Sequence, residues 1–246
     1  MNSLPMTSVF ARHISEVDNT MYVKDHMTRN PKTITKDMKV STALDIMQKN
    51  DFHRLPVVDD SGKLIGLITE GLVAESTNSN ATMLDIYELN YLLSRTLVKD
   101  LMITNVKTIH PDVLLEEAAA KMLENRVSVL PVTDDRDQVV GIITEKDIFQ
   151  AFLDLMGYRH QGTRFVLECK DVPGEFADAA RLFADADANL ESCAVYHTDR
   201  GAEIVIKATG EIPVEEMTDI LVKHGYKITN IIQTNNDGTT KHYPTK

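Results

Sequence analysis

Two stretches of the chain carry apolar residues at the spacing of an amphipathic helix, and each is followed by two short apolar runs. The helical stripes start at Val40 and at Leu115 and continue three, four and seven residues later, which places them on one helix face. Turn residues rich in Asp and Gly separate the runs, as in a hairpin. The runs span 54–58, 64–68, 129–133 and 139–143. We therefore predict the order helix, strand, strand, helix twice.

The two stretches are copies of each other. Val23-Lys24-Asp25-His26-Met27 aligns with Val98-Lys99-Asp100-Leu101-Met102, and the match continues without a gap at an offset of 75 residues, as from Val23 to Val98. Leu55-Pro56-Val57 meets Leu130-Pro131-Val132 in the same register. A unit this small buries too little apolar surface to be stable alone. We expect the copies to pack as a pseudo-twofold pair.

The pattern also divides the chain into segments. Residues 1–20 show no periodicity and are expected to be a flexible leader, and both Met1 and Met21 are candidate starts of translation. The first copy spans 21–75 and the second 98–157. Residues 76–97 are a connecting loop and helix. The polar loop, 75–80, begins at the end of the first copy, and Thr82-x-x-Asp85 is a capping box at the start of the connecting helix.

The last third is a different unit, with a linker at 158–163 and a domain at 164–246. Its apolar runs predict a strand over 164–170, a turn at 171–174 and a helix. Two strands, a helix opened by Pro213 and a last strand follow; the strands are expected at 190–197, 202–208 and 226–233. The order βαββαβ is a ferredoxin-like sandwich, so the fold class is α+β throughout.

Composition and charge exclude several function classes. The 246 residues include 26 Lys and Arg and 37 Asp and Glu, a net charge of −11 that disfavours a nucleic-acid partner and a transcriptional role. The chain lacks the roughly 18 consecutive apolar residues of a membrane span, and its start lacks a secretory signal, so we expect a cytoplasmic protein. Cys169 and Cys193 are expected to be core thiols without a disulfide.

Catalytic motifs are missing from the sequence. The eight histidines are scattered without metal-ligand spacing, and no Gly-x-Ser-x-Gly or Walker sequence is present. We expect neither an enzyme nor a required cofactor or metal. The chemistry instead lies where the copies differ: Asp147 corresponds to Leu72, His53-Arg54 to Ser128-Val129, and Thr28 to Ile103.

The duplicated pattern resembles a known family. V-x-D-x-M, the L-P-V strand and G-h-h-T, where h is apolar, occur in register in both copies, and the second copy extends the last motif to G-h-h-T-x-x-D. This pattern is similar to a pair of CBS domains, called a Bateman module, over residues 21–152. Residues 87–94 between the copies resemble the acetoin-utilisation B type of bacterial CBS protein. The C-terminal domain, with its turn at 171–174, is similar to an ACT domain.

The resemblance implies an adenine nucleotide between the copies. Asp147 and Thr144 would hold the ribose, Arg54, His53 and Lys32 would meet phosphates, and the other residues would line the base. The residues that the family pattern assigns to this site are Thr28, Lys32, His53, Arg54, Pro56, Ile142, Thr144 and Asp147. The alternative is structural: Asp147 caps the helix after Thr144, while His53 and Arg54 make surface salt bridges.

The ACT resemblance implies a second ligand turn at Val172, Pro173 and Gly174, where amino acids bind in that family. The alternative is a plain strand-to-helix turn in which Gly174 supplies an unusual backbone angle. We expect a homodimer.

Three functions remain open from the sequence. The first is a non-catalytic regulator that senses AMP, ADP, ATP or cyclic di-AMP and acts on an unidentified protein target. The others are a ligand-free interaction scaffold and an amino-acid sensor that works through the ACT-like domain.

Overall fold

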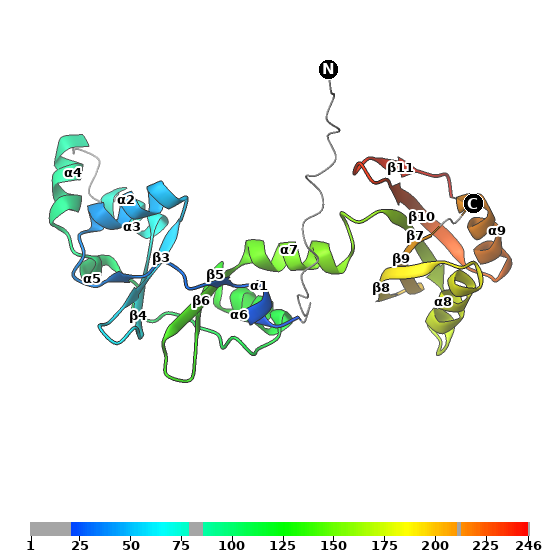
Figure 1. Cartoon of the computed structure of the whole chain (residues 1–246), viewed down its shortest axis with the longest axis horizontal. Coiled ribbons are helices and arrows are strands. Elements are labelled where there is room, and N and C mark those ends of the chain that lie inside the picture. Colours follow the sequence, from blue (N-terminus) through cyan, green and yellow to red (C-terminus); the bar gives the residue numbers. More distant parts are fainter. Residues whose placement is uncertain (1–20, 79–85, 211–212, 246) are drawn as a thin grey trace, which may run out of the picture. The chain divides into compact units, whose positions relative to one another are not determined.

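A computed structural model describes residues 21–78, 86–210 and 213–245, and the chain forms two compact units, Met1–Ile148 and Phe149–Lys246 (Figure 1). The expected leader, 1–20, and the capping box Thr82-x-x-Asp85 lie outside the described residues.

The first copy has the predicted elements in the predicted order. The amphipathic stripe is the buried face of α2, with Val40, Ala43 and Met47 in the core. Residues 75–78 continue a helix, because no Gly or Pro breaks it there, so the polar loop predicted at 75–80 is wrong in this part. The elements up to the connecting helix are α1 (Val23–His26), β1 (Thr28–Arg29), β2 (Ile34–Thr35), α2 (Val40–Asn50), β3 (Arg54–Val58), β4 (Leu64–Thr69), α3 (Glu70–Asn78) and α4 (Ile86–Arg95).

The second copy repeats this pattern. Its stripe buries Leu115, Ala118 and Met122, the counterparts of the core residues of α2. Its elements are α5 (Val98–Leu101), α6 (Leu115–Asn125), β5 (Val129–Thr133), β6 (Val139–Thr144) and α7 (Glu145–Leu155).

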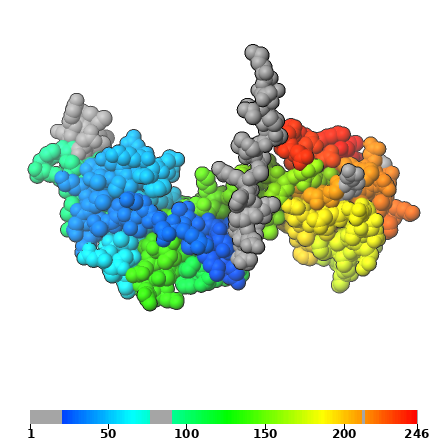
Figure 2. All heavy atoms as spheres, viewed as in Figure 1, coloured from blue at the N-terminus to red at the C-terminus, as the bar shows by residue number. Residues whose placement is uncertain are grey.

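The copies exchange their first segments. β1 of the first copy pairs with β6 of the second, which places Thr28 opposite Ile142 and gives the sheet order β1-β6-β5. At the corresponding position, Ile103 and Leu67 exchange backbone hydrogen bonds of 2.9 Å beside the sheet β2-β3-β4. Figure 2 shows the blue first segment lying against green atoms of the second copy. The predicted pseudo-twofold pair is confirmed.

The C-terminal unit has the predicted βαββαβ order and one additional strand. Its sheet order is β11-β10-β7-β9-β8, and both helices cover one face, where Phe165, Phe183 and Met217 share a core. The elements are β7 (Gly162–Cys169), α8 (Glu175–Asp185), β8 (Asn189–Thr198), β9 (Gly201–Thr209), α9 (Val214–Lys223), β10 (Lys227–Thr234) and β11 (Thr240–His242).

Three details of this unit differ from the sequence prediction. The first strand begins at Gly162, two residues before the predicted start, because Thr163 and Gly162 pair with β10. β11 was not predicted, because its Thr-Lys-His sequence is exposed and has no apolar signal. Cys169 is buried, but Cys193 lies on the edge strand β8 and is exposed, so it is no core thiol. Both cysteines are free, as expected.

Candidate ligand site between the two repeats

A cavity of about 460 Å³ lies between the two copies and is lined by both. Its wall brings together seven of the eight residues that the sequence assigns to a ligand site. They are Thr28, Lys32, His53, Arg54, Pro56, Ile142 and Thr144. The pairing of β1 with β6 is what joins Thr28 to Ile142, because it carries the first segment into the second copy's sheet. The eighth residue, Asp147, does not line the cavity but is hydrogen-bonded to Thr144, which does.

Thr144 and Asp147 form a reciprocal cap at the start of α7. Asp147 Oδ2 accepts hydrogen bonds from the Thr144 backbone N, at 2.8 Å, and from Thr144 Oγ1, at 2.7 Å. The Asp147 backbone N donates to Thr144 Oγ1 at 3.4 Å. The residue is half-buried, and within the described chain Asp147 Oδ1 accepts no hydrogen bond. The predicted cap of α7 is therefore present, and it uses only the Oδ2 oxygen of Asp147.

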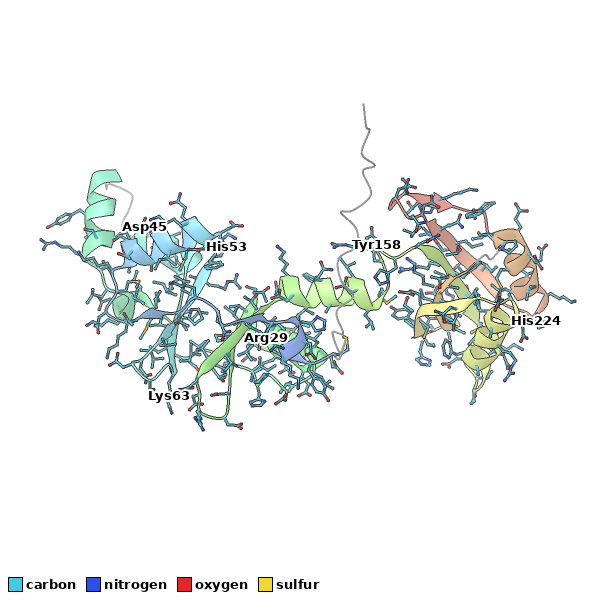
Figure 3. All side chains as sticks on the ribbon, viewed as in Figure 1. Arg29, Asp45, His53, Lys63, Tyr158 and His224 are labelled. Atoms are coloured by element: carbon cyan, nitrogen blue, oxygen red, sulfur yellow. The ribbon has the colours of Figure 1, made fainter. Side chains whose placement is uncertain are left out.

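The two basic residues at the start of β3 have protein partners. Arg54 Nη1 donates to the backbone O and to Oγ of Ser128, both at 3.1 Å, so it links the first copy to the second. His53 Nδ1 lies 2.8 Å from Glu70 Oε2, and both side chains are largely exposed. Figure 3 labels His53 on the first copy. Arg54 Nε and Nη2 make no hydrogen bond to the described residues, so this guanidinium keeps donors for a ligand.

Sequence reasoning missed half of the cavity wall. The additional lining residues are Pro31, Asp51, Phe52, Leu55, Ser128, Glu145 and Lys146. Phe52 is the most informative of them, because this aromatic side chain is 39% exposed. The signal was available: Phe52 precedes His53-Arg54, and its counterpart in the second copy is Val127.

Charge in the cavity is mixed. Lys32, Arg54 and Lys146 contribute permanent positive charges, and Asp51 and Glu145 contribute carboxylates. The two lysines are exposed and have no hydrogen-bond or ion-pair partner within the described chain. This arrangement suits a ligand with an anionic part and an apolar part, since ligand cavities combine mostly apolar walls with a few polar anchors.

The pseudo-twofold axis relates this site to a second set of positions with different chemistry. Val129 replaces Arg54 and is buried, and Leu72 replaces Asp147. Thr69 keeps one half of the cap, because its Oγ1 accepts a hydrogen bond from the Leu72 backbone N at 3.1 Å. The second set of positions therefore lacks the guanidinium of Arg54 and the carboxylate of Asp147, although Thr69 and Lys107 correspond to Thr144 and Lys32.

The turn predicted as an ACT-like ligand site lies in a separate cavity of about 310 Å³ in the C-terminal unit. Val172, Pro173 and Gly174 all line it. Gly174 has φ +104, a left-handed angle that glycine adopts without strain, and it directly precedes α8. The left-handed angle of Gly174 agrees with a plain strand-to-helix turn. The turn also borders an open cavity.

The described residues contain neither a metal-binding cluster nor a membrane-spanning helix. No group of three or more His, Cys, Asp or Glu side chains is arranged to hold a metal ion. Within the same residues, every helix is too short or too polar to cross a membrane.

Comparison with known proteins agrees with the duplication. The profile of the CBS domain matches residues 23–75 and 98–154. L-aspartate semialdehyde sulfurtransferase of Methanocaldococcus jannaschii is 32% identical over 130 residues, which are 53% of this chain and 23% of that protein. The chain thus spans about a quarter of this curated relative.

Solved structures match the same part of the chain. The CBS domain pair of protein MJ0100 in complex with 5'-methylthioadenosine and S-adenosyl-L-methionine is 32% identical, with 54% of this chain and 96% of that one covered and a TM-score of 0.47. A putative acetoin utilization protein (AcuB) from Vibrio cholerae is 28% identical over 56% of this chain and 93% of that one, with a TM-score of 0.47. Residues 23–75 and 98–154 of this chain are a tandem pair of CBS domains, which together form the cavity.

Proposed function

We propose that this chain is a non-catalytic regulatory protein that binds an adenine nucleotide in the cavity between its two CBS domains. The observation that carries the proposal is the composite wall: Thr28 and Arg54 come from one domain, and Ile142 and Thr144 from the other. A ligand held by both domains stabilises their contact and is therefore suited to regulate it.

The free carboxylate oxygen of Asp147 supports a ribose site. Two ribose hydroxyls need acceptors, and an ionised carboxylate has two oxygens with several lone pairs. Asp147 Oδ2 is occupied by Thr144, while Oδ1 is available. The cap and the ligand contact are thus compatible, because they use different oxygens of one side chain.

The base and the phosphates have separate walls. Pro56, Ile142 and Phe52 supply apolar and aromatic surface for an adenine ring. Arg54, Lys32 and His53 supply positive or ionisable groups for phosphates, and Lys146 adds another. Arg54 also contacts Ser128, so a phosphate bound to Arg54 would act directly on the contact between the domains.

The similarity to the MJ0100 domain pair supports the ligand class. Both ligands in that structure contain an adenosine group, and its sequence is 32% identical to the matched part of this chain. Which adenine compound binds here depends on how its phosphates meet Arg54 and the lysines.

The test is calorimetric titration of the full chain with AMP, ADP, ATP, cyclic di-AMP, S-adenosylmethionine and NAD. We expect one compound to bind, and the variants Asp147→Ala and Arg54→Ala to weaken that binding by at least about tenfold, since bonds to charged groups contribute roughly 1.5–3 kcal/mol.

The repeat offers a matched control for this titration. Lys32 and Lys107 occupy corresponding exposed positions, but only Lys32 lines the cavity. Lys32→Ala should weaken binding of a phosphorylated ligand, and Lys107→Ala should not. If no adenine compound binds, or if the two lysine variants behave alike, the proposal is wrong and the chain acts as a scaffold.

A second candidate function rests on the cavity at Val172, Pro173 and Gly174. An amino acid bound there would make the C-terminal unit a second sensor. A panel of amino acids, titrated into the full chain and into a Gly174→Ala variant, tests it; unchanged heats in both would exclude this function.

A further inference from the structure

The face of the C-terminal sheet that lies away from its helices carries a row of polar side chains. Arg164 on β7 pairs with Lys207 on β9 and with Ile232 on β10, and Ile232 pairs with His242 on β11. Side chains of directly opposed residues lie on the same face of a sheet. The flanking Phe165 and Ile206 belong to the helix-covered core, so this row is on the other face.

The segment after α7 crosses this face and is fixed there by the row. Arg164 Nη2 donates to Met156 O at 2.9 Å, and Ser192 Oγ donates to the same oxygen at 3.0 Å. Lys207 Nζ donates to Gly157 O at 2.6 Å and to His160 O. Lys207 is only 2% exposed as a result. Figure 3 labels Tyr158 in this segment.

The segment and the row enclose a cavity of about 300 Å³. Four of its lining residues are basic: Arg159, Arg164, Lys207 and His242. None of the lining residues is Asp or Glu, although the whole chain has a net charge of −11. The cavity between the CBS domains differs in this respect, because Asp51 and Glu145 balance part of its charge.

The positive charges of this cavity are not neutralised by the protein groups that bind them. Lys207 and Arg164 donate to backbone carbonyls, which carry no net charge. Glu191, whose charge acts on Lys207, is paired with His160 and does not line the cavity. Burial, and then the charge of Arg164, lower the pKa of Lys207. Arg159 makes no hydrogen bond or ion pair within the described residues.

We propose that this cavity binds a small organic anion, whose carboxylate or phosphate group lies among Arg159, Arg164 and Lys207. Guanidinium groups bind both anions through paired hydrogen bonds. The volume exceeds that of an inorganic phosphate, and Tyr158 and Ile232 offer apolar surface for the rest of the molecule. The hydroxyls of Thr234 and Thr240 are further donors.

The test is titration of the full chain, at low ionic strength, with three anions that contain no adenine: inorganic phosphate, glycerol 3-phosphate and succinate. We expect saturable binding of at least one organic anion. Arg159→Gln should weaken it about tenfold, the equivalent of one charge-assisted hydrogen bond. Arg159 is exposed and has no protein partner, so this variant should fold normally.

Arg181→Gln is the matched control, because Arg181 is exposed on α8 of the same unit and does not line the cavity. Equal weakening by both variants, or no saturable binding of any probe, would overturn the inference. Stronger binding of glycerol 3-phosphate than of succinate identifies a phosphate ligand, and the reverse a carboxylate. This site is independent of the nucleotide proposal: Asp147→Ala should leave anion binding unchanged, and adenosine should bind only between the CBS domains.

Discussion

At the scale of single residues, two glycines explain how the CBS domains exchange their first segments. A Cβ atom on Gly141 would lie 2.2 Å from Met27 Sδ, and one on Gly66 would lie 2.5 Å from Met102 Sδ. Both glycines and both methionines are related by the 75-residue offset. Each methionine thus fills the space that the glycine of the other domain leaves open.

Gly141→Ala should therefore destabilise the protein. Overpacking of a tight contact costs about 1–3 kcal/mol, which urea denaturation will measure. Met27→Ala in the same chain should recover part of the loss, because it removes the side chain that clashes. Gly71→Ala is the control: its Cβ would have no neighbour closer than 3.9 Å, and alanine favours a helix. A neutral Gly141→Ala would contradict the packing.

Tyr226 gives a residue-scale prediction for alkaline pH. Its hydroxyl donates to Glu175 O at 2.8 Å, and burial followed by the charge of Glu175 raises its pKa to about 12. The folded protein keeps a proton that the unfolded chain releases above pH 10, so this contribution to stability is present below pH 10 and is lost as the pH rises toward 12. Tyr226→Phe removes the titration.

We expect the stability advantage of the wild type over Tyr226→Phe to shrink by roughly 1 kcal/mol between pH 9 and pH 11. Urea denaturation of both proteins at the two pH values measures this difference, in which the titration of other groups cancels. A constant difference would show that the hydroxyl ionises at an ordinary pKa.

At the scale of elements, the corresponding helices α7 and α3 differ in the side chains that cap them. Among the described side chains, Thr69 alone caps the corresponding helix α3, through the Leu72 backbone N, whereas α7 has the carboxylate of Asp147 as well. The first N–H groups of a helix need acceptors, and in α3 the Glu70 backbone N donates to His53 O at 3.0 Å while the Leu72 backbone N donates to Thr69 Oγ1. The additional carboxylate of α7 is thus beyond what the fold requires.

Asp147→Ala should cost about 1 kcal/mol of stability, the usual effect of losing a side-chain cap. Asp147→Asn should cost less, because its amide oxygen still accepts from the Thr144 backbone N. If nucleotide binding is lost equally in both variants, the carboxylate acts on the ligand and not through helix stability. Thermal unfolding and titration of the two proteins separate these effects.

At the scale of the whole molecule, the CBS domains depend on each other's backbone. The Lys24 backbone N donates to Pro111 O, and the Lys99 backbone N donates to Lys36 O, both at 2.9 Å. Two exposed ion pairs follow the same symmetry, Lys24 with Asp112 and Lys99 with Asp37, each at 2.8 Å. Each domain therefore takes some of its hydrogen-bond acceptors and ion-pair partners from the other domain.

A fragment of residues 98–157 should therefore be largely unfolded, while residues 21–157 should unfold cooperatively. Circular dichroism with urea denaturation tests both. Mixing the fragments 21–97 and 98–157 should restore helix content, because the exchanged contacts then form between chains. Independent folding of 98–157 would show that the exchange is not needed for stability.

Much of this architecture is determined by sequence because it follows from local rules. The 75-residue offset, the stripes of α2 and α6 and the order of strands in the last unit depend on periodicity and turn residues. The family resemblance, together with the divergence of the copies at His53, Arg54 and Asp147, predicted one composite site, and His53 and Arg54 line the cavity. Exposed β11 and exposed Cys193 escaped prediction, because a short polar strand and a cysteine on an edge strand carry no local signal.

Only the tertiary structure decided which groups meet. The sequence determined the two CBS domains and their candidate ligand residues, because hydrophobic period and repeat register are properties of the chain itself. The contact of Arg54 with Ser128, 74 residues apart, forms between the two CBS domains, and the row of Arg164, Lys207 and His242 arises from strand pairing. Such contacts join residues that are far apart in the chain. They depend on strand order and burial, which local sequence patterns do not reveal.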